Sequence, residues 1–172
     1  SATLTTFAHT FITHTMQEAS ILVIDDEEKL RSLLARIIRL EGFTVTEAGD
    51  IKSGLKLLEK NHADVVLCDV KLPDGSGIDV VSHIRQHHPC TEVILLTAYG
   101  NIPDSVQAMK NGAFDYITKG DDNDRIIPLL NRALEKVQLQ KRVRVLEQQV
   151  GHRYGFDNIL GSSPPIKEAI LL

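Results

Sequence analysis

Polar residues follow four separate apolar runs in this sequence, and each run is of the kind that forms a buried strand. These residues are Asp25 and Asp26, Asp69, Thr97, and Lys119. Clustered carboxylates repel one another and raise one another's pKa unless a cation joins them. Oxygen ligands that leave room for water and phosphate oxygens suit Mg²⁺. If the runs end side by side, these residue types fit a site for Mg²⁺ and a phosphoryl group.

The roles that phosphoryl chemistry requires can be divided among the same side chains. Asp69 can act as the nucleophile, as carboxylates do in enzymes that form an aspartyl phosphate. Lys119 can neutralise an incoming phosphoryl group, and the Thr97 hydroxyl can donate to a phosphoryl oxygen. Phosphoryl transfer needs mainly positioning and charge neutralisation, so this small set of side chains is chemically sufficient.

These side chains meet only if the apolar runs form parallel strands of one sheet. We predict strands within residues 21–24, 43–48, 65–68, 93–96 and 113–118. A segment with apolar residues at helical spacing follows each strand, and residues 70–75 are expected to form a loop. Strands that alternate with helices form a parallel sheet through right-handed crossovers. We therefore predict an α/β fold: a five-stranded parallel sheet, doubly wound, in flavodoxin-like order, with ligands at the carboxyl ends of the strands.

The last predicted helix begins near Asp122 and is longer than the sheet requires. Its apolar residues up to Val137 are spaced to cover the sheet. After a change of phase, a seam of roughly one and a half heptads follows, formed by Leu139, Val143, Leu146 and Val150. Charged residues flank this seam, as in a solvated coiled coil, and we predict that it forms a dimer; a frayed amphipathic helix is the alternative. Gly151 is expected to end the helix.

Composition argues against several classes of protein. The net charge of -4 gives no general signal for nucleic-acid binding, and no apolar run is long enough to cross a membrane. Cys68 and Cys90 lie beside strand-like runs, which suits reduced thiols in a cytoplasmic protein. Residues 1–19 are expected to be a disordered tail or a non-native extension, because the strong patterning begins after Met16.

Four motifs, ILVIDDE, VLCDVKLPDGSG, LLTAYG and GAFDYITK, together resemble the receiver domain of bacterial two-component response regulators. The resemblance covers about residues 20–137, and residues 138–151 would follow as a coiled-coil linker helix. It implies that Asp69 accepts a phosphoryl group from a sensor histidine kinase. It also implies that Asp26, Asp69 and the Lys71 carbonyl bind Mg²⁺. Asp25 would act largely through water.

The resemblance implies further roles at the strand ends. Thr97 and Lys119 would contact the phosphoryl group, Tyr116 would change rotamer on phosphorylation, and Tyr99 would line the same switch surface. The family usually has Lys-Pro with a cis peptide where this sequence has Lys119-Gly120. A cis peptide without proline costs about 2.5–4 kcal/mol, so we expect a trans peptide here. This departure leaves the aim of Lys119 open and favours the alternative of a receiver-like dimerisation module that is not phosphorylated.

The tail, residues 152–172, contains FDNILGSSPPIKEAI, which resembles the opening of the AAA+ domain of NtrC-type activators of sigma-54 RNA polymerase. The resemblance implies a full-length ATPase that reaches sigma-54 RNA polymerase and DNA through further domains. No G-x-x-x-x-G-K-[ST] loop occurs in this sequence, so we expect this chain itself to bind no ATP. The basic residues beside the seam are interpreted as flanks of a coiled coil, so we also expect this chain to bind no DNA.

Three histidines, His83, His87 and His88, fall on or after the third predicted helix, away from the carboxyl edge of the sheet. They raise the possibility of a metal or phosphorelay site. The sequence favours a solvated helix face instead.

Overall fold

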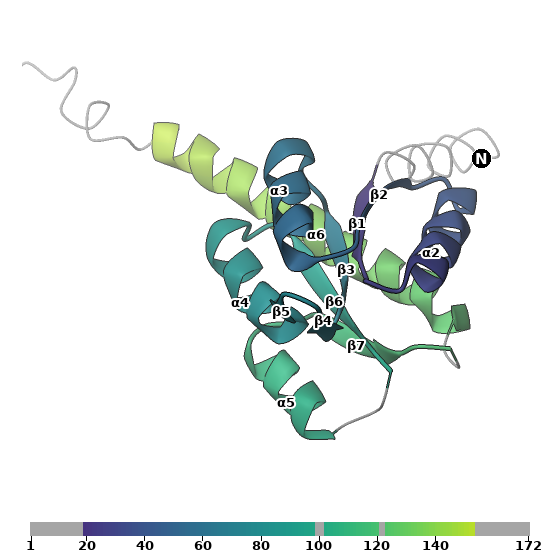
Figure 1. The fold of residues 1–172 in the computed structure, drawn as a ribbon. Helices are drawn as coiled ribbons and strands as arrows, with labels where there is room; N and C mark the ends of the chain where they lie inside the picture. Colours follow the sequence, from purple (N-terminus) through teal and green to yellow (C-terminus); the bar gives the residue numbers. More distant parts are fainter. Residues whose placement is uncertain (1–18, 99–101, 121–122, 154–172) are drawn as a thin grey trace, which may run out of the picture. The chain divides into compact units, whose positions relative to one another are not determined.

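The computed structural model describes residues 19–98, 102–120 and 123–153 (Figure 1). Its main sheet has five strands in the order β2-β1-β3-β6-β7, and all neighbouring strands are parallel. The strands are β1 (Ser20–Ile24), β2 (Thr44–Ala48), β3 (Val65–Asp69), β6 (Glu92–Thr97) and β7 (Asp115–Thr118). This is the doubly wound, flavodoxin-like order, so the predicted fold class is confirmed.

Helices cover both faces of the sheet, which explains why β1, β3 and β6 are almost continuously apolar. The helices are α2 (Glu28–Leu40), α3 (Ile51–Asn61), α4 (Gly77–His87), α5 (Ile102–Lys110) and α6 (Asn123–Arg153). One core cluster joins the sheet to α2 and to the part of α6 up to Leu134. The other core cluster joins the opposite face to α3, α4 and α5 (Figure 1).

The central strand β3 is buried at all five positions and lies between β1 and β6. In the register, Cys68 lies opposite Ile24 and Asp69 lies opposite Leu96. Asp69 therefore ends the central strand beside the ends of both neighbours. By contrast, β7 has four residues, pairs only with β6 and lies at an edge of the sheet.

The segment after β3 is a hairpin rather than the predicted irregular loop. Two short antiparallel strands, β4 (Lys71–Leu72) and β5 (Gly75–Ser76), pair with each other. A Cβ atom at Gly77 would lie 2.2 Å from the Asp69 carbonyl oxygen. Only glycine therefore allows α4 to begin so close behind the end of β3.

A buried charge network ties the opposite, amino edge of the sheet to its helices. Glu92 is fully buried at the start of β6 and pairs with Arg85 of α4 and, at 3.1 Å, with Lys136 of α6. Arg85 also donates from Nε to the Gly112 carbonyl at 2.7 Å. Because the Glu92 carboxylate is fully buried, leaving it without a cationic partner is costly, so this network fixes α4, α6 and the turn after α5 to the sheet.

Helix α6 passes through Gly151 and ends at Arg153, so the predicted end at Gly151 is wrong. A glycine inside a helix costs only about 1 kcal/mol, and a long helix tolerates it. The chain divides into two compact units, residues 1–137 and 138–172. Among the described residues, no helix combines the length and apolarity needed to cross a membrane.

Candidate functional site

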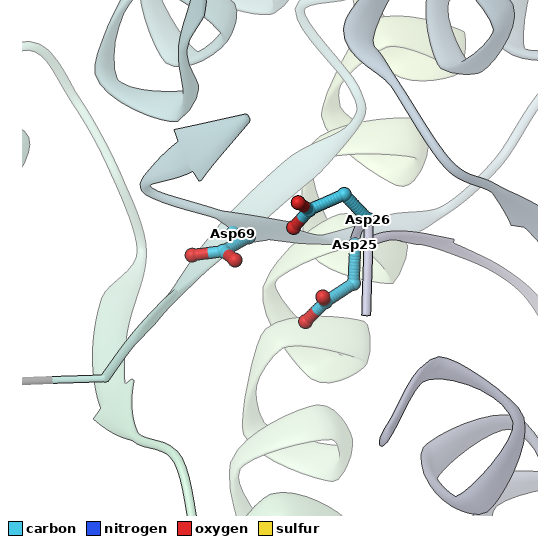
Figure 2. A group of neighbouring side chains, drawn as sticks. All are labelled: Asp25, Asp26 and Asp69. Carbon is cyan, nitrogen blue, oxygen red and sulfur yellow. The ribbon is translucent and has the colours of Figure 1, made fainter. Parts of the chain in front are cut away.

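Three carboxylates meet at the carboxyl edge of the sheet, as Figure 2 shows. Asp25 and Asp26 directly follow β1, and Asp69 is the last residue of β3. Since these neighbouring parallel strands end together, one oxygen from each carboxylate lies within 4.8 Å of the others. Asp25 is fully buried and Asp69 is 7% exposed, whereas Asp26 is open to solvent. The site therefore has a buried floor and one accessible carboxylate.

Lys119 brings an ammonium to this group of carboxylates from the end of β7. Its Nζ lies 2.6 Å from Oδ2 of Asp69 and 2.7 Å from Oδ2 of Asp25. Partial burial favours the neutral amine, but hydrogen bonding and charge from the two carboxylates outweigh burial and raise the pKa of Lys119. Lys119 is therefore charged at neutral pH and offsets part of the negative charge of the site.

These contacts answer the question that Gly120 raises in the sequence: Lys119 does point at Asp69. The Lys119–Gly120 peptide is trans, as expected. Gly120 has a φ of 96°, a conformation closed to proline, whose ring holds φ near about −65°. The Lys119 amide donates to the Thr97 carbonyl at 2.8 Å and holds the end of β7 against β6.

The surroundings of Asp69 affect its ionisation. Desolvation by burial raises the pKa of Asp69, and hydrogen bonds from Lys119 and the Lys71 amide oppose this without cancelling it. The Lys71 amide donates to Oδ1 of Asp69 at 3.2 Å. In the described residues, three acceptor-only carboxylates thus face one ammonium at this site. A hard divalent cation that prefers oxygen ligands fits this donor set.

Cys68 lies next to Asp69 but has no place in this chemistry. The thiol is fully buried, and burial, followed by the nearby charges of Asp69 and Asp25, raises its pKa well above its usual range. A thiol that remains protonated is neither a nucleophile nor a metal ligand. Cys90 is partly buried, and the two cysteines do not form a disulfide.

The hairpin that carries Lys71 is fastened to the start of α3 by Asp74, a residue that the sequence analysis did not single out. Oδ1 of Asp74 accepts from the Ile51 amide at 3.0 Å, and Oδ2 accepts from the Lys52 amide at 3.0 Å. First-turn amides have no partner within their own helix, so the carboxylate satisfies two of them. These two bonds lower the pKa of Asp74. The sequence signal was an Asp in the turn Pro73-Asp74-Gly75, but its partner lies 23 residues earlier.

The structure places the other predicted site residues as follows. Thr97 is the half-buried last residue of β6, and Tyr116 in β7 is 37% exposed. Tyr99 lies outside the described residues. In α6, each residue of the predicted seam is more than half exposed: Leu139, Val143, Leu146 and Val150. The structure thus brings together Asp25, Asp26, Asp69 and Lys119.

Comparison with known proteins identifies the family of domains to which this sheet and its carboxylate site belong. Residues 21–144 match the family model described as the response regulator receiver domain. The chain belongs to this family. Its receiver is of the NtrC type, because the relatives it matches include AtoC and NtrC.

Three proteins show the extent of the similarity. The regulatory protein AtoC of Escherichia coli (strain K12) is 35% identical over 148 residues, which cover 86% of this chain and 32% of AtoC. The DNA-binding transcriptional regulator NtrC of Proteus hauseri is 30% identical over 153 residues, which cover 89% of this chain and 32% of NtrC. The beryllofluoride-activated NtrC4 receiver domain dimer is 30% identical with a TM-score of 0.65, and the match covers 69% of this chain and 98% of that one. This receiver chain thus spans about a third of the length of these curated relatives.

Proposed function

We propose that this receiver accepts a phosphoryl group on Asp69 from a sensor histidine kinase and responds by a change in dimer state. The observation that supports this most strongly is the contact of Asp69 with the Lys119 ammonium inside a group of three carboxylates. A carboxylate oxygen of Asp69 attacks the phosphorus of a phosphohistidine. The phosphorus–nitrogen bond breaks, and its electron pair stays on the imidazole nitrogen, which takes up a proton.

Mg²⁺ is the cofactor that this donor set suits. Asp26, Asp69 and the main-chain carbonyl of Lys71 would hold the ion, and Asp25 would act on it largely through water. When bound, Mg²⁺ supplies positive charge for the phosphoryl oxygens. Asp25 has a second role in this arrangement, because its ion pair holds the Lys119 ammonium beside Asp69.

The remaining residues of the site convert phosphorylation into a change of surface. Lys119 would pair with a phosphoryl oxygen in place of the Asp69 oxygen that it contacts in the resting site. The Thr97 hydroxyl would donate to another phosphoryl oxygen. Tyr116, which is exposed in this structure, would turn inward as Thr97 moves, and Tyr99 would line the same surface. The face formed by α5 and β7 then differs between the two states.

We further propose that this receiver controls a sigma-54-dependent transcriptional activator in the cytoplasm. The seam from Leu139 to Val150 would form the homodimer, and residues 152–172 would begin an AAA+ domain. Contacts with sigma-54 RNA polymerase and DNA would be made by other parts of the full-length protein. Two relatives support this proposal: NtrC is a DNA-binding transcriptional regulator, and the NtrC4 receiver is a beryllofluoride-activated dimer.

The alternative is a receiver-like module that dimerises without being phosphorylated. Lys119-Gly120 is the feature that favours this alternative, but Lys119 reaches Asp69 through a trans peptide. Incubation with acetyl phosphate and Mg²⁺, followed by intact mass spectrometry, separates the two functions. We expect the wild-type chain to gain one phosphoryl group and Asp69→Asn to gain none. An equal gain in both proteins would place the acceptor elsewhere, and no gain in either would favour the alternative.

A further inference from the structure

The four histidines whose side chains the structure describes gather at the amino edge of the sheet, opposite the carboxylate site. His62 caps the C-terminal end of α3, His83 and His87 lie in the last turns of α4, and His88 caps α4. The C-terminal ends of helices in a parallel α/β fold lie at the edge where the strands begin. This group is therefore separate from Asp69 and has no part in the proposed phosphoryl chemistry.

His83 and His87 form the centre of the group. They are one helical turn apart, so their side chains project from the same face of α4. Their rings stack with centroids 4.3 Å apart and an angle of 25° between the ring planes. His83 is half-buried and His87 is exposed, so the pair is accessible from solvent. Two imidazoles are thus held side by side at the surface of one helix.

A hydrogen bond assigns the tautomer of His87. Its Nδ1 lies 2.9 Å from the His83 carbonyl oxygen. A carbonyl only accepts, so Nδ1 carries the proton, and Nε2 of the neutral ring keeps a free electron pair. Metal-binding histidines usually donate the other ring N–H to a carbonyl or a carboxylate in this way. Nε2 is therefore the ring nitrogen of His87 that remains available as a metal ligand.

His88 directly follows His87 in the chain, and His62 lies near enough to His88 to affect its pKa. Partial burial, followed by the charges of His62, His83 and His87, lowers the pKa of His88, which shows that the four imidazoles share one electrostatic environment. Among the described residues, His62 is the one non-glycine residue with a positive φ, 52°, a conformation that is uncommon outside glycine. The Ser20 hydroxyl donates to the His62 carbonyl at 3.1 Å and helps to hold the turn.

We propose that His83 and His87 chelate a divalent transition-metal ion of the Zn²⁺, Cu²⁺ or Ni²⁺ class, with water completing the coordination. Imidazole is a preferred ligand for these metals, and two histidines one turn apart on a helix have the spacing of helical zinc motifs. Mg²⁺ prefers hard oxygen ligands, so the two edges of the sheet select different cations. The sequence alone favours a solvated face, and the structure adds the proximity of the two rings and the Nδ1 contact of His87. The His83 ring would turn out of the stack so that both rings direct a nitrogen lone pair at one ion.

Nuclear magnetic resonance of the whole chain tests this site directly. Zn²⁺ is added in the presence of saturating Mg²⁺, and the imidazole resonances are followed together with backbone amides near Asp69. We expect the His83 and His87 ring signals to shift first. His83→Gln and His87→Gln should each weaken Zn²⁺ binding by about tenfold or more, because each variant loses the chelate.

Two control variants show which site the metal occupies. Gln86→Ala changes an exposed residue in the same turn of α4 and should leave Zn²⁺ affinity unchanged. Asp26→Asn should weaken Mg²⁺ binding without changing the response of the imidazoles to Zn²⁺. Retained Mg²⁺ binding in the histidine variants would show that they are folded. Unchanged Zn²⁺ affinity in the double variant H83Q/H87Q, or shifts confined to the carboxylate edge, would overturn the proposal.

Discussion

The ammonium of Lys119 contacts two carboxylates, Asp25 and Asp69, which have different roles in the proposed reaction. Asp25 is fully buried and is not the carboxylate that reacts. Asp69 becomes the phosphorylated residue, and its contact with Lys119 must then pass to a phosphoryl oxygen. Because Asp25 lies 2.7 Å from Nζ, the ammonium remains anchored when Asp69 changes. The two carboxylates thus have separate roles: Asp25 holds the Lys119 ammonium, and Asp69 reacts with the phosphoryl donor.

The electrostatic balance of the site predicts the effect of removing this ammonium. Lys119→Met leaves three carboxylates without their cation, so we expect Mg²⁺ to bind about tenfold more tightly, a modest part of the interaction between adjacent charges. Calorimetric titration with Mg²⁺ measures this change. Lys52→Met removes an exposed lysine of α3 and should have a much smaller effect. Unchanged or weaker Mg²⁺ binding in Lys119→Met would show that the Lys119 charge does not offset the charge of the carboxylates.

Burial of Asp69 also affects stability. Folding of the metal-free chain raises the pKa of Asp69, so protonation of Asp69 favours the folded state. This contribution to stability is fully present below the ordinary carboxyl pKa. This contribution is lost as the pH rises through the raised value. Asp69→Asn removes the charge, so we expect the metal-free variant to be more stable than the wild type at neutral pH.

In excess Mg²⁺ we expect the wild type to be more stable than Asp69→Asn, because the ion binds the folded wild type through Asp69. At about 100 times its dissociation constant, a ligand adds about 2.7 kcal/mol to the free energy of unfolding. Urea unfolding followed by circular dichroism, in EDTA and in excess Mg²⁺, measures both effects. An equal gain from Mg²⁺ in both proteins would show that Asp69 is not a ligand.

At the scale of elements, the β4–β5 hairpin connects the site to α3 through Asp74. Asp74→Ala removes two hydrogen bonds to first-turn amides, so we expect it to lower the free energy of unfolding. It should also weaken Mg²⁺ binding severalfold, because the hairpin no longer holds the Lys71 carbonyl in place. Calorimetry and urea unfolding on the same protein separate the two effects.

A matched control is available in the same helix. Asp50 caps α3 by accepting from the Ser53 amide at 2.7 Å, and it makes no contact of this kind with the hairpin. Asp50→Ala should therefore lose a similar amount of stability and keep its Mg²⁺ affinity. If both variants lost Mg²⁺ affinity equally, general destabilisation would explain the result and Asp74 would have no special role.

The elements that sequence patterns predicted well are those buried on both faces. The run Val65–Cys68 is apolar throughout because helices cover both sides of β3, and this pattern identifies a central strand. Because parallel strands end at one edge, the pattern also predicted that Asp25, Asp26 and Asp69 meet there. The two-residue strands β4 and β5 have no such periodicity, so the hairpin was missed.

Other features depend on contacts that are distant in the sequence. The sequence left open the direction of the Lys119 side chain, and its contacts with Asp25 and Asp69 come from strands far away in the chain. Glu92 reads as a polar residue at the start of a strand, yet it is fully buried because Arg85 and Lys136 reach it from two helices. Local patterns carry no information about such partners, and only the folded arrangement reveals them.

At the scale of the whole molecule, the proposed output is a change of dimer state through the seam of α6. Leu146 is 59% exposed and belongs to the seam, whereas Val145 is 52% exposed and lies outside it. A charge in a coiled-coil seam opposes association, so Leu146→Glu should weaken the dimer by about tenfold or more. Val145→Glu adds the same charge next to the seam and should behave like the wild type.

Light scattering with and without beryllofluoride and Mg²⁺ measures this effect. We expect the wild type and Val145→Glu to change their oligomeric state in the same way, and Leu146→Glu to remain largely monomeric. If Leu146→Glu and Val145→Glu dimerised equally, the dimer interface would lie outside the seam.

Because β7 lies at the edge of the sheet, we expect it to open locally more readily than the central strand β3. Asp69 belongs to a strand held on both sides, whereas Lys119 follows a four-residue strand held by β6 alone. Amide hydrogens in such edge elements exchange through local openings that need far less free energy than global unfolding. We therefore expect the β7 amides to exchange faster than those of β3 in the resting chain. Beryllofluoride should slow the exchange of the β7 amides, because this phosphoryl mimic would form an additional ion pair with Lys119 and disfavour local opening.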